Sequence, residues 1–547
     1  MPTDKLRSTT FAAGPNAVLP AFEDFQRARV EFAQEVAKLA LPEDPLADKT
    51  ATAPGGTYEV DGREKVVATL EASYNLLADM RPLVNDLSPA VRENALLAMG
   101  RLSNLSSKLQ QQIAEEDTLG ATISGISTAA TPALTKAALF MLHAAVQPSV
   151  DVANFAVERN VLPALCERLE DRDSSIKAAA VWCFGAIANH SADLAASVAD
   201  SGALQLLLQC LKEPSLPLRR VALACLGCIA KHDHSLADLV NKDGALAAAV
   251  GFLTHKDMLL RRQACRLLAC AVQHNEKSID WVPSKERPNV VETLRAAGGA
   301  GDGETGAFAA TLVQQLSKHS KTVATGFFEL KAVPLLVAHI AGGSGSPAPA
   351  ASALGHICDA SADAAAAAVA SGAIGAIKGV LERMAPPPVC AALCSALGAI
   401  SFAGESHANA IAASGAMQLM AEATILSGRK MGPATTALAR KGIAKAVNKC
   451  ADYEVLTWLI EALPFTGGNA QHEVLAALLK AMGRLLANRG NYRLDFMQRG
   501  ALTLCQQATK GTAELKEGLK ALNTTYPPQM VAATDPNYES ALLAKIS

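Results

Sequence analysis

Aromatic side chains are scarce in this chain: they make up 4% of its 547 residues, although hydrophobic residues make up 50%. A hydrophobic content dominated by Ala and Leu favours stacked helices and argues against a β-sandwich, whose strands are enriched in aromatic and β-branched residues. The sequence has no run of about 18 apolar residues, so we expect no transmembrane helix and no membrane partner. The N-terminal stretch MPTDKLRSTTFAAGP has no long apolar segment and predicts no signal peptide.

A strong charge of one sign is also lacking. The formal net charge is −2, which gives no general attraction to nucleic acid or to a membrane surface. The sequence contains neither G-x-x-x-x-G-K-[ST] nor a G-x-G-x-x-G between a strand and a helix, and no Ser/His/Asp spacing is recognisable. The glycine-rich stretch GGAGDG at residues 298–303 has no strand before it. We therefore expect no enzymatic activity, no cofactor and no nucleic-acid partner.

The twelve cysteines do not form a disulfide or zinc pattern. Cys225 and Cys228 are spaced as C-x-x-C, but no second pair follows and their surroundings are apolar. Buried free cysteines behave as small hydrophobic residues. We expect reduced thiols, no metal site, and a reducing compartment such as the cytosol or nucleus. Eight cysteines lie in or near the long helices described next: Cys183, Cys225, Cys228, Cys265, Cys270, Cys358, Cys390 and Cys394.

The chain does contain a unit that repeats about every 42 residues. It is clearest at His190, His232, His274 and His319, which lie 42, 42 and 45 residues apart. The runs that precede them are AAAVWCFGAIAN, RVALACLGCIAK, RQACRLLACAVQ and AATLVQQLSK. A helical repeat of this length predicts an all-α solenoid of armadillo or HEAT type, and the phase gives about ten repeats. Further landmarks in the same phase are Leu105, Pro148, Ala360, Ala403, Val447 and Asn488.

Each repeat is expected to contain three helices. In the clearest case a short first helix carries DLAASVAD, a second carries ALQLLLQCLK, and a long third carries LRRVALACLGCIAKH. Glycine is suited to the turn between the first two helices because it enters the left-handed region without strain. Three helices per unit favour armadillo over HEAT, so we predict an armadillo-repeat, right-handed superhelical solenoid. A Gly-Ala pair marks the turn at residues 202–203, 244–245, 372–373, 415–416 and 500–501.

The repeats are expected to occupy most of the chain. We predict a disordered N-terminus at residues 1–16, a capping helix at 17–41 and a loop at 42–63. In the capping helix, Phe22, Phe25, Val30, Phe32, Val36 and Leu39 fall near one face, which we expect to cover the first repeat. Armadillo repeats then follow over 64–510, with loops at about 276–306 and 342–350, and a C-terminal cap and tail at 511–547.

Two groups of basic residues are candidate partner contacts. No acidic residue occurs between 423 and 451, and a stripe near i, i+4 spacing on this stretch could dock an acidic surface, although a solvated helix face explains it equally well. Paired arginines that open successive third helices would form a ladder along one edge of the solenoid, or ordinary surface. The stripe consists of Arg429, Lys430, Arg440, Lys441, Lys445 and Lys449, and the ladder of Arg219, Arg220, Arg261 and Arg262.

The repeated histidines also have two readings. One histidine per repeat places neighbours roughly one layer apart, about 10 Å, which is too far for shared metal ligation. We expect instead that each histidine caps the C-terminus of the third helix that it ends, where positive charge is favoured.

The chain resembles the sperm-associated antigen 6 family of armadillo proteins from the ciliary central apparatus. The stretches that carry the resemblance are VLPAFEDFQRARVEFAQEVAKLA, RENALLAMGRLSN, IKAAAVWCFGAIANHSADLAASVADSGA, LRRVALACLGCIAKHDHSLADLV and ALNTTYPPQMVAATDPNYESALLAKI. The connection at 41–70 and the segments at 276–306 and 342–350 depart from the family, which suggests a divergent paralogue.

The resemblance implies a non-enzymatic structural protein of the axoneme in cilia and flagella, associated with the C1 microtubule of the central pair. The partners it implies are central-pair tubulin and other central-apparatus proteins, including like armadillo proteins, and self-association stays open. Two alternatives remain. A nuclear-import adaptor would carry a ladder of Trp followed four residues later by Asn, but Trp182 is followed by Ala186. A catenin-type signalling scaffold is also consistent with the composition.

Overall fold

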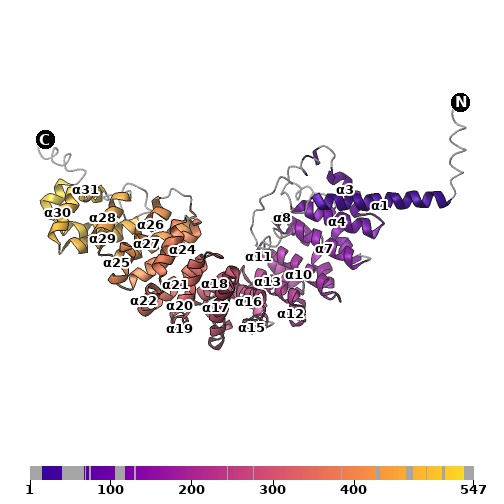
Figure 1. The fold of residues 1–547 in the computed structure, drawn as a ribbon, viewed down its shortest axis with the longest axis horizontal. Coiled ribbons are helices and arrows are strands. Elements are labelled where there is room, and N and C mark those ends of the chain that lie inside the picture. Colours follow the sequence, from indigo (N-terminus) through magenta and orange to yellow (C-terminus); the bar gives the residue numbers. More distant parts are fainter. Residues whose placement is uncertain are drawn as a thin grey trace, which may run out of the picture. The chain divides into compact units, whose positions relative to one another are not determined.

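The computed structural model consists of helices and their connections. It describes residues 15–39, 67, 69, 71–72, 76–104, 118–128, 131–242, 244–274, 276–383, 385–426, 431–463, 472–487, 489–507 and 512–534, and these contain no β-strand. The chain divides into two compact units, Met1–Ala248 and Ala249–Ser547, and each is described by itself (Figure 1).

The first unit begins with the long helix α1 and continues with shorter helices. Their bounds are α1 Pro15–Leu39, α3 Leu76–Val84, α4 Pro89–Ser103, α6 Thr118–Thr128, α7 Pro132–Val146, α8 Val150–Glu158, α9 Val161–Leu169, α10 Ser174–Ala188, α11 Ala192–Asp200, α12 Ala203–Lys212, α13 Leu216–Ala230 and α14 His234–Lys242. Helix α15, Ala245–Phe252, contains the division between the units.

The second unit continues the same order of helices. Its first half contains α16 Met258–Val272, the 3₁₀ turns η2 Glu276–Trp281 and η3 Ser284–Glu286, α17 Arg287–Ala300, α18 Gly303–His319, α19 Lys321–Glu329, α20 Ala332–Gly342 and α21 Ala348–Ala360. Its second half contains α22 Ala362–Ala370, α23 Ala373–Glu382, α24 Pro387–Phe402, α25 Glu405–Ala413, α26 Ala416–Ala421, the π-helical turn η4 Glu422–Leu426, α27 Pro433–Asn448, α28 Tyr453–Ala462, α29 His472–Ala487, α30 Gly490–Gln498, α31 Ala501–Gln506, α32 Ala513–Asn523 and α33 Pro528–Ala533.

The long third helices form the spine of each unit. In the first unit α4, α7, α10 and α13 pack one against the next, and in the second α16, α18, α21, α24, α27, α29 and α32 do the same. Helix α32 lies in the segment that the sequence assigned to the C-terminal cap, and it packs on α29 as the other third helices pack on their neighbours. The three-helix unit predicted from DLAASVAD, ALQLLLQCLK and LRRVALACLGCIAKH is α11, α12 and α13.

Small residues set the spacing of this spine. A methyl group built on Gly398 of α24 would lie 2.3 Å from the carbonyl oxygen of Gly442 in α27, so the two backbones touch. In the first unit, a methyl group on Gly100 of α4 would lie 2.8 Å from the ring of Phe140 on α7. The expectation that small residues allow close approach of the layers is therefore confirmed at these contacts.

The predicted glycine turns are confirmed by their backbone angles. Gly202, Gly244, Gly372, Gly415 and Gly500 all have φ between 74° and 86°. Two repeats make the same turn without glycine, because Asn160 and Lys331 adopt φ of 58° and 59° at the residue before the second helix. Asparagine tolerates this conformation, whereas lysine adopts it at a cost in free energy.

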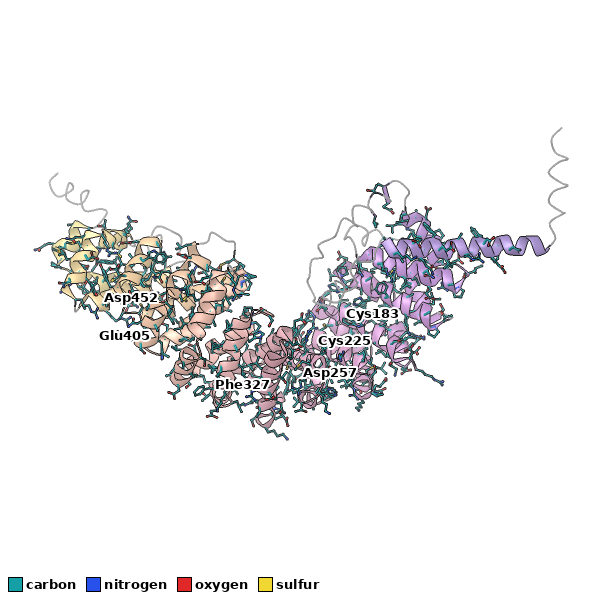
Figure 2. The ribbon with its side chains drawn as sticks, in the orientation of Figure 1. Cys183, Cys225, Asp257, Phe327, Glu405 and Asp452 are labelled. Atoms are coloured by element: carbon teal, nitrogen blue, oxygen red, sulfur yellow. The ribbon has the colours of Figure 1, made fainter. Side chains whose placement is uncertain are left out.

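Side-chain caps define where the helices begin. Asp257 accepts a hydrogen bond from the backbone N–H of Leu260 at 2.7 Å, and Asp452 accepts one from Val455 at 3.2 Å. Both aspartates are labelled in Figure 2. Such caps satisfy backbone donors that a helix start otherwise leaves open.

The glycines at 276–306 led us to expect a loop, but the segment is only partly a loop. Helix α17 occupies 287–300 of it and takes the place of a second helix. Val290, Val291, Leu294 and Ala297 are buried at helical spacing, and this apolar face outweighs the glycines that follow it. The second expected loop, 342–350, is shorter: α20 ends at Gly342 and α21 begins at Ala348.

Helix α1 is covered over only part of its length. Ala33, Val36 and Ala37 are buried against the first repeat, whereas Phe22 and Phe25 are each 57% exposed. Helix α1 therefore packs on the first repeat, as expected, but does so through its C-terminal half. The 25-residue α1 is longer than the 15-residue α4 on which it packs, and its N-terminal half extends beyond that helix (Figure 1).

Candidate protein-binding surface

Each third helix buries most of its circumference and leaves one stripe exposed. In the first unit the middle of this stripe holds Leu97, Phe140 and Trp182 on α4, α7 and α10, which are 43 and 42 residues apart. Trp182 is 45% exposed and meets the ring of His143 edge to face at 5.7 Å. Burial lowers the pKa of His143 to about 4, so its ring is neutral at pH 7. This part of the surface is apolar and uncharged.

The corresponding stripe in the second unit is basic around one aromatic ring. Phe402, the last residue of α24, is 49% exposed. The Nζ atoms of Lys445 and Lys449 each lie 5.9 Å from the centre of its ring. Lys445 also forms an ion pair with Asp359 of α21 at 2.7 Å. Lys441, one turn before Lys445, is exposed, and the described residues give it no ion-pair partner.

The predicted basic stripe is thus brought together only in part. Lys441, Lys445 and Lys449 share the exposed face of α27 or its end, and we call them the lysine row. Arg440 points elsewhere: it is half-buried, burial lowers the pKa of its guanidinium, and Glu473 of α29 opposes that shift. Arg429 and Lys430 lie outside the described residues. Sequence spacing alone did not single out Phe402, which becomes recognisable once the third helices are aligned in register.

The predicted arginine ladder is not a row of free charges. Arg262, 17% exposed, forms an ion pair with Asp302 at 2.8 Å and another with Glu304, and its Nε donates to Thr305 Oγ1 at 3.0 Å. These partners begin α18, so Arg262 joins α16 to the next third helix. Arg262 is therefore a link between two neighbouring third helices.

The other arginines of the ladder also lie against their own chain. The Nε groups of Arg219 and Arg261 fold back onto the backbone carbonyls of Glu213 and His255. Arg220 is half-buried on α13. These contacts hold the start of each third helix to the turn before it.

Two of the four repeated histidines, His190 and His232, cap a different helix from the one expected, whereas His319 Nε2 is buried without a hydrogen-bond partner among the described residues. His190 Nε2 lies 2.7 Å from the carbonyl oxygen of Val146, and His232 Nε2 lies 2.7 Å from that of Ala188. A carbonyl only accepts, so Nε2 carries the proton and donates. Each ring therefore caps the third helix of the preceding repeat. Lys231 adds to the second link, because its Nζ donates to the Asn189 carbonyl at 2.6 Å.

Ten of the twelve cysteines are buried, and Cys166 and Cys270 are half-buried. All twelve are free thiols, and Cys183 and Cys225 lie on the neighbouring third helices α10 and α13 (Figure 2). The Cys183 thiol donates to the Leu139 carbonyl at 3.3 Å. Burial raises the pKa of Cys265 to about 12, which keeps it a neutral thiol. Cys225 and Cys228 are both buried in the middle of α13, as the apolar reading of this pair expects.

The described residues contain no group of three or more His, Cys, Asp or Glu side chains placed to hold a metal ion. Taken singly, none of their helices has the length and apolarity to cross a membrane, and three bent helix pairs meet those criteria by length and composition only.

Comparisons with known proteins agree with the repeat architecture. A HEAT repeat model matches residues 161–191, which span α9 and α10. Sperm-associated antigen 6 from Mus musculus is 30% identical over 102 residues, which are 19% of this chain and 16% of that protein. The match therefore spans about a sixth of the length of that curated relative.

Solved structures show the fold more broadly. An engineered protein has a TM-score of 0.57 and 16% identity, covering 82% of this chain and 98% of its own. A designed armadillo repeat protein in complex with the peptide (KR)4 has a TM-score of 0.40 and 17% identity over 44% of this chain and 99% of its own. With three helices per repeat and stacked third helices, the chain is an all-α armadillo-type solenoid, a class of scaffold for protein interactions.

Proposed function

We propose that this chain is a structural scaffold of the axonemal central apparatus, which holds neighbouring proteins in place at the C1 microtubule of the central pair. The observation that carries the scaffold role is the exposed stripe that the third helices form within each unit. It offers Trp182 in one unit and Phe402 with the lysine row in the other. The axonemal assignment is supported by the resemblance of the sequence and by the 30% identity to sperm-associated antigen 6 over 102 residues.

The internal links explain how such a scaffold keeps its surface in order. His190 ties α10 to α7, and Arg262 ties α16 to α18. Each link joins a third helix to its neighbour, so the exposed stripes stay in register within a unit. A surface fixed in this way loses little entropy when it binds, which favours a role in holding partners.

The lysine row is the part of this surface that we assign to an acidic partner such as tubulin or another central-apparatus protein. Exposed charges of one sign attract an acidic surface from a distance and speed its association. Such contacts weaken as salt is added, because the Debye length falls to about 8 Å at physiological ionic strength. The remaining candidates, Arg429 and Lys430, stay part of the proposal as sequence neighbours of this surface.

Localisation of a tagged copy tests the assignment directly. The proposal expects the tag along the central pair of motile cilia. A signal at the nuclear envelope would favour the import adaptor, and a signal at the cell cortex or in the cytosol would favour the catenin-type scaffold. A tag that is absent from the axoneme in ciliated cells contradicts the proposed function.

Salt extraction of axonemes tests the lysine row. Lys441→Glu with Lys449→Glu should release the protein at lower ionic strength than the wild-type chain, and the series should be run at several salt concentrations. Lys212→Glu on the exposed end of α12 is the matched control, because it reverses charge on another unit. Equal extraction of all three proteins would remove the lysine row from the interface.

A further inference from the structure

We infer that Phe402 and the lysine row form a binding site for an extended acidic segment of a partner protein, in which an apolar side chain lies between carboxylates. This inference deepens the proposed scaffold role and rests on it. Nothing in the sequence spacing assigns Phe402 to a site, and half of its side chain is exposed.

Phe402 is unusual for its position in the repeat. Phe402 occupies the same position in its helix as a series of polar residues in the helices before it. At intervals of 41 to 45 residues these are Asn104, Gln147, Asn189, Lys231, Gln273, Lys318 and Asp359. A polar side chain at this position stays hydrated. A half-exposed phenyl ring instead leaves apolar surface in contact with water, which is unfavourable. Phe402 is the aromatic exception in this series.

Positive charge surrounds the ring. Lys445 lies near the end of α27, the next third helix, one residue before the position that corresponds to Phe402. Its Nζ and that of Lys449 both lie 5.9 Å from the ring centre, within the range of a cation–π contact. Lys441 lies one turn before Lys445, and among the described residues the ion pair that the lysine row makes is the one with Asp359. The three lysines of the row therefore exceed the carboxylate that pairs with them.

The Asp359 carboxylate is held by the lysine row. Lys445 donates to both oxygens of Asp359, at 2.8 and 2.7 Å, and thereby joins the helices on either side of Phe402. The carboxylate of Asp359 binds beside the ring, as a carboxylate of a partner would. It pairs with one of the three lysines, Lys445. An incoming acidic segment competes with it for Lys445 and finds Lys441 and Lys449 available. Removing the Asp359 charge should therefore tighten binding.

The geometry favours a protein segment over other polyanions. Single-stranded nucleic acid binds to successive aromatic platforms, and the described part of this stripe offers one ring among the lysines. An anionic membrane is recognised by clusters of four to eight basic residues, more than the lysine row contains. A peptide with carboxylates on either side of one apolar side chain matches both the ring and the charges.

The experiment uses the purified full-length chain and two fluorescein-labelled peptides of twelve residues. One is all Glu with a single Leu at its centre, and the other has Ser in place of that Leu. We expect the Leu peptide to bind more tightly than the Ser peptide by about tenfold, which is the usual effect of one well-placed apolar anchor. Affinity should fall with added salt for both peptides.

Four variants and one control separate the contributions of the ring, the lysines and Asp359. Phe402→Ala should weaken the Leu peptide by about tenfold and bring it level with the Ser peptide, while Phe402→Leu keeps most of the affinity. Lys441→Glu with Lys449→Glu should weaken both peptides by more than about tenfold. Asp359→Asn should tighten both by about threefold, a direction that misfolding cannot produce. Lys212→Glu, remote from the site, should bind as the wild type does.

Several outcomes would overturn the inference. Equal affinity for the Leu and Ser peptides, or no effect of Phe402→Ala, would remove the ring from the site. Weaker binding by the Asp359→Asn variant would mean that Asp359 does not compete with the peptide for Lys445. Tighter binding of oligouridine or of phosphatidylserine vesicles than of the Leu peptide would assign the surface to nucleic acid or membrane. The assay needs no axoneme, so failure of the proposed localisation and failure of this site are distinguishable.

Discussion

The imidazole of His190 lies 2.7 Å from the carbonyl oxygen of Val146, the last residue of the third helix one repeat earlier. His232 makes the same contact with Ala188 at the end of α10. The same contact thus occurs at two successive repeats. In each, the histidine that follows a third helix caps the third helix before it. The carbonyls at a helix C-terminus have no partner within the helix, so a donor from the next repeat satisfies one of them.

Loss of this link should lower stability. His190→Ala leaves the Val146 carbonyl without its donor and should cost about 1 kcal/mol of unfolding free energy. His190→Gln retains an N–H donor and should recover part of that loss. Urea denaturation of the three proteins measures the effect. If the alanine variant unfolds at the wild-type urea concentration, the hydrogen bond does not stabilise the stack.

The glycine contact between α24 and α27 predicts a larger effect. A methyl group on Gly398 would lie 2.3 Å from the Gly442 carbonyl oxygen, so Gly398→Ala forces the helices apart and should cost about 1–3 kcal/mol. Gly379→Ala in α23 is the control, because no atom lies within 4 Å of the added methyl. That change should stabilise by up to about 1 kcal/mol, since alanine favours a helix interior over glycine. Thermal melts of both variants should therefore shift in opposite directions.

Replacing Lys331 by glycine should stabilise the protein. Its φ of 59° is a left-handed conformation that costs a non-glycine residue about 1 kcal/mol, and the turn that it makes is made by glycine at five other repeats. Lys331→Gly should therefore raise the melting temperature, whereas Gly202→Ala at the equivalent turn should lower it. A decrease in both variants would mean that the lysine side chain contributes more than its backbone costs.

Asp302 caps the start of α18, and its carboxyl group should make the free energy of unfolding depend on pH. Burial raises the pKa of Asp302, but hydrogen bonds from Thr305 and the charge of Arg262 outweigh it and hold that pKa below its usual value. A carboxyl with a lowered pKa in the folded state stabilises above its unfolded pKa and loses that contribution as pH falls through the folded value. Asp302→Asn should cost about 1 kcal/mol at pH 7. The difference from wild type should shrink below about pH 4, as pH-dependent denaturation would show.

Much of the architecture is predictable from the sequence because a stacked repeat must solve the same problem many times. Gly202 and its counterparts mark the turns, since a left-handed turn selects glycine, and the histidines mark the helix ends. The contacts between repeats are harder to predict. Lys445 and Asp359 are 86 residues apart, and only stacking places them across one helix.

The same limit applies to the candidate site. Arg262 lies at the expected place in the sequence, but Asp302 and Glu304 engage it because α18 begins beside it. Charge spacing could show that Lys441, Lys445 and Lys449 share a helix face. It could not show that Phe402 from another helix lies among them, because that depends on the offset between α24 and α27. Local patterns thus predict elements and faces, whereas the partner of a side chain depends on helix packing.

The partly covered helix α1 predicts a contrast within a single apolar face. Phe22 and Phe25 are each 57% exposed, so Phe22→Ser with Phe25→Ser should change the unfolding free energy by no more than about 0.5 kcal/mol. Val36→Ala removes two buried methyl groups against the first repeat and should cost about 1–2 kcal/mol. Urea denaturation of the two variants tests which half of the face the chain uses. A large loss for the double serine variant would mean that the N-terminal half of α1 is packed in solution, and the face would then cover the first repeat along its whole length.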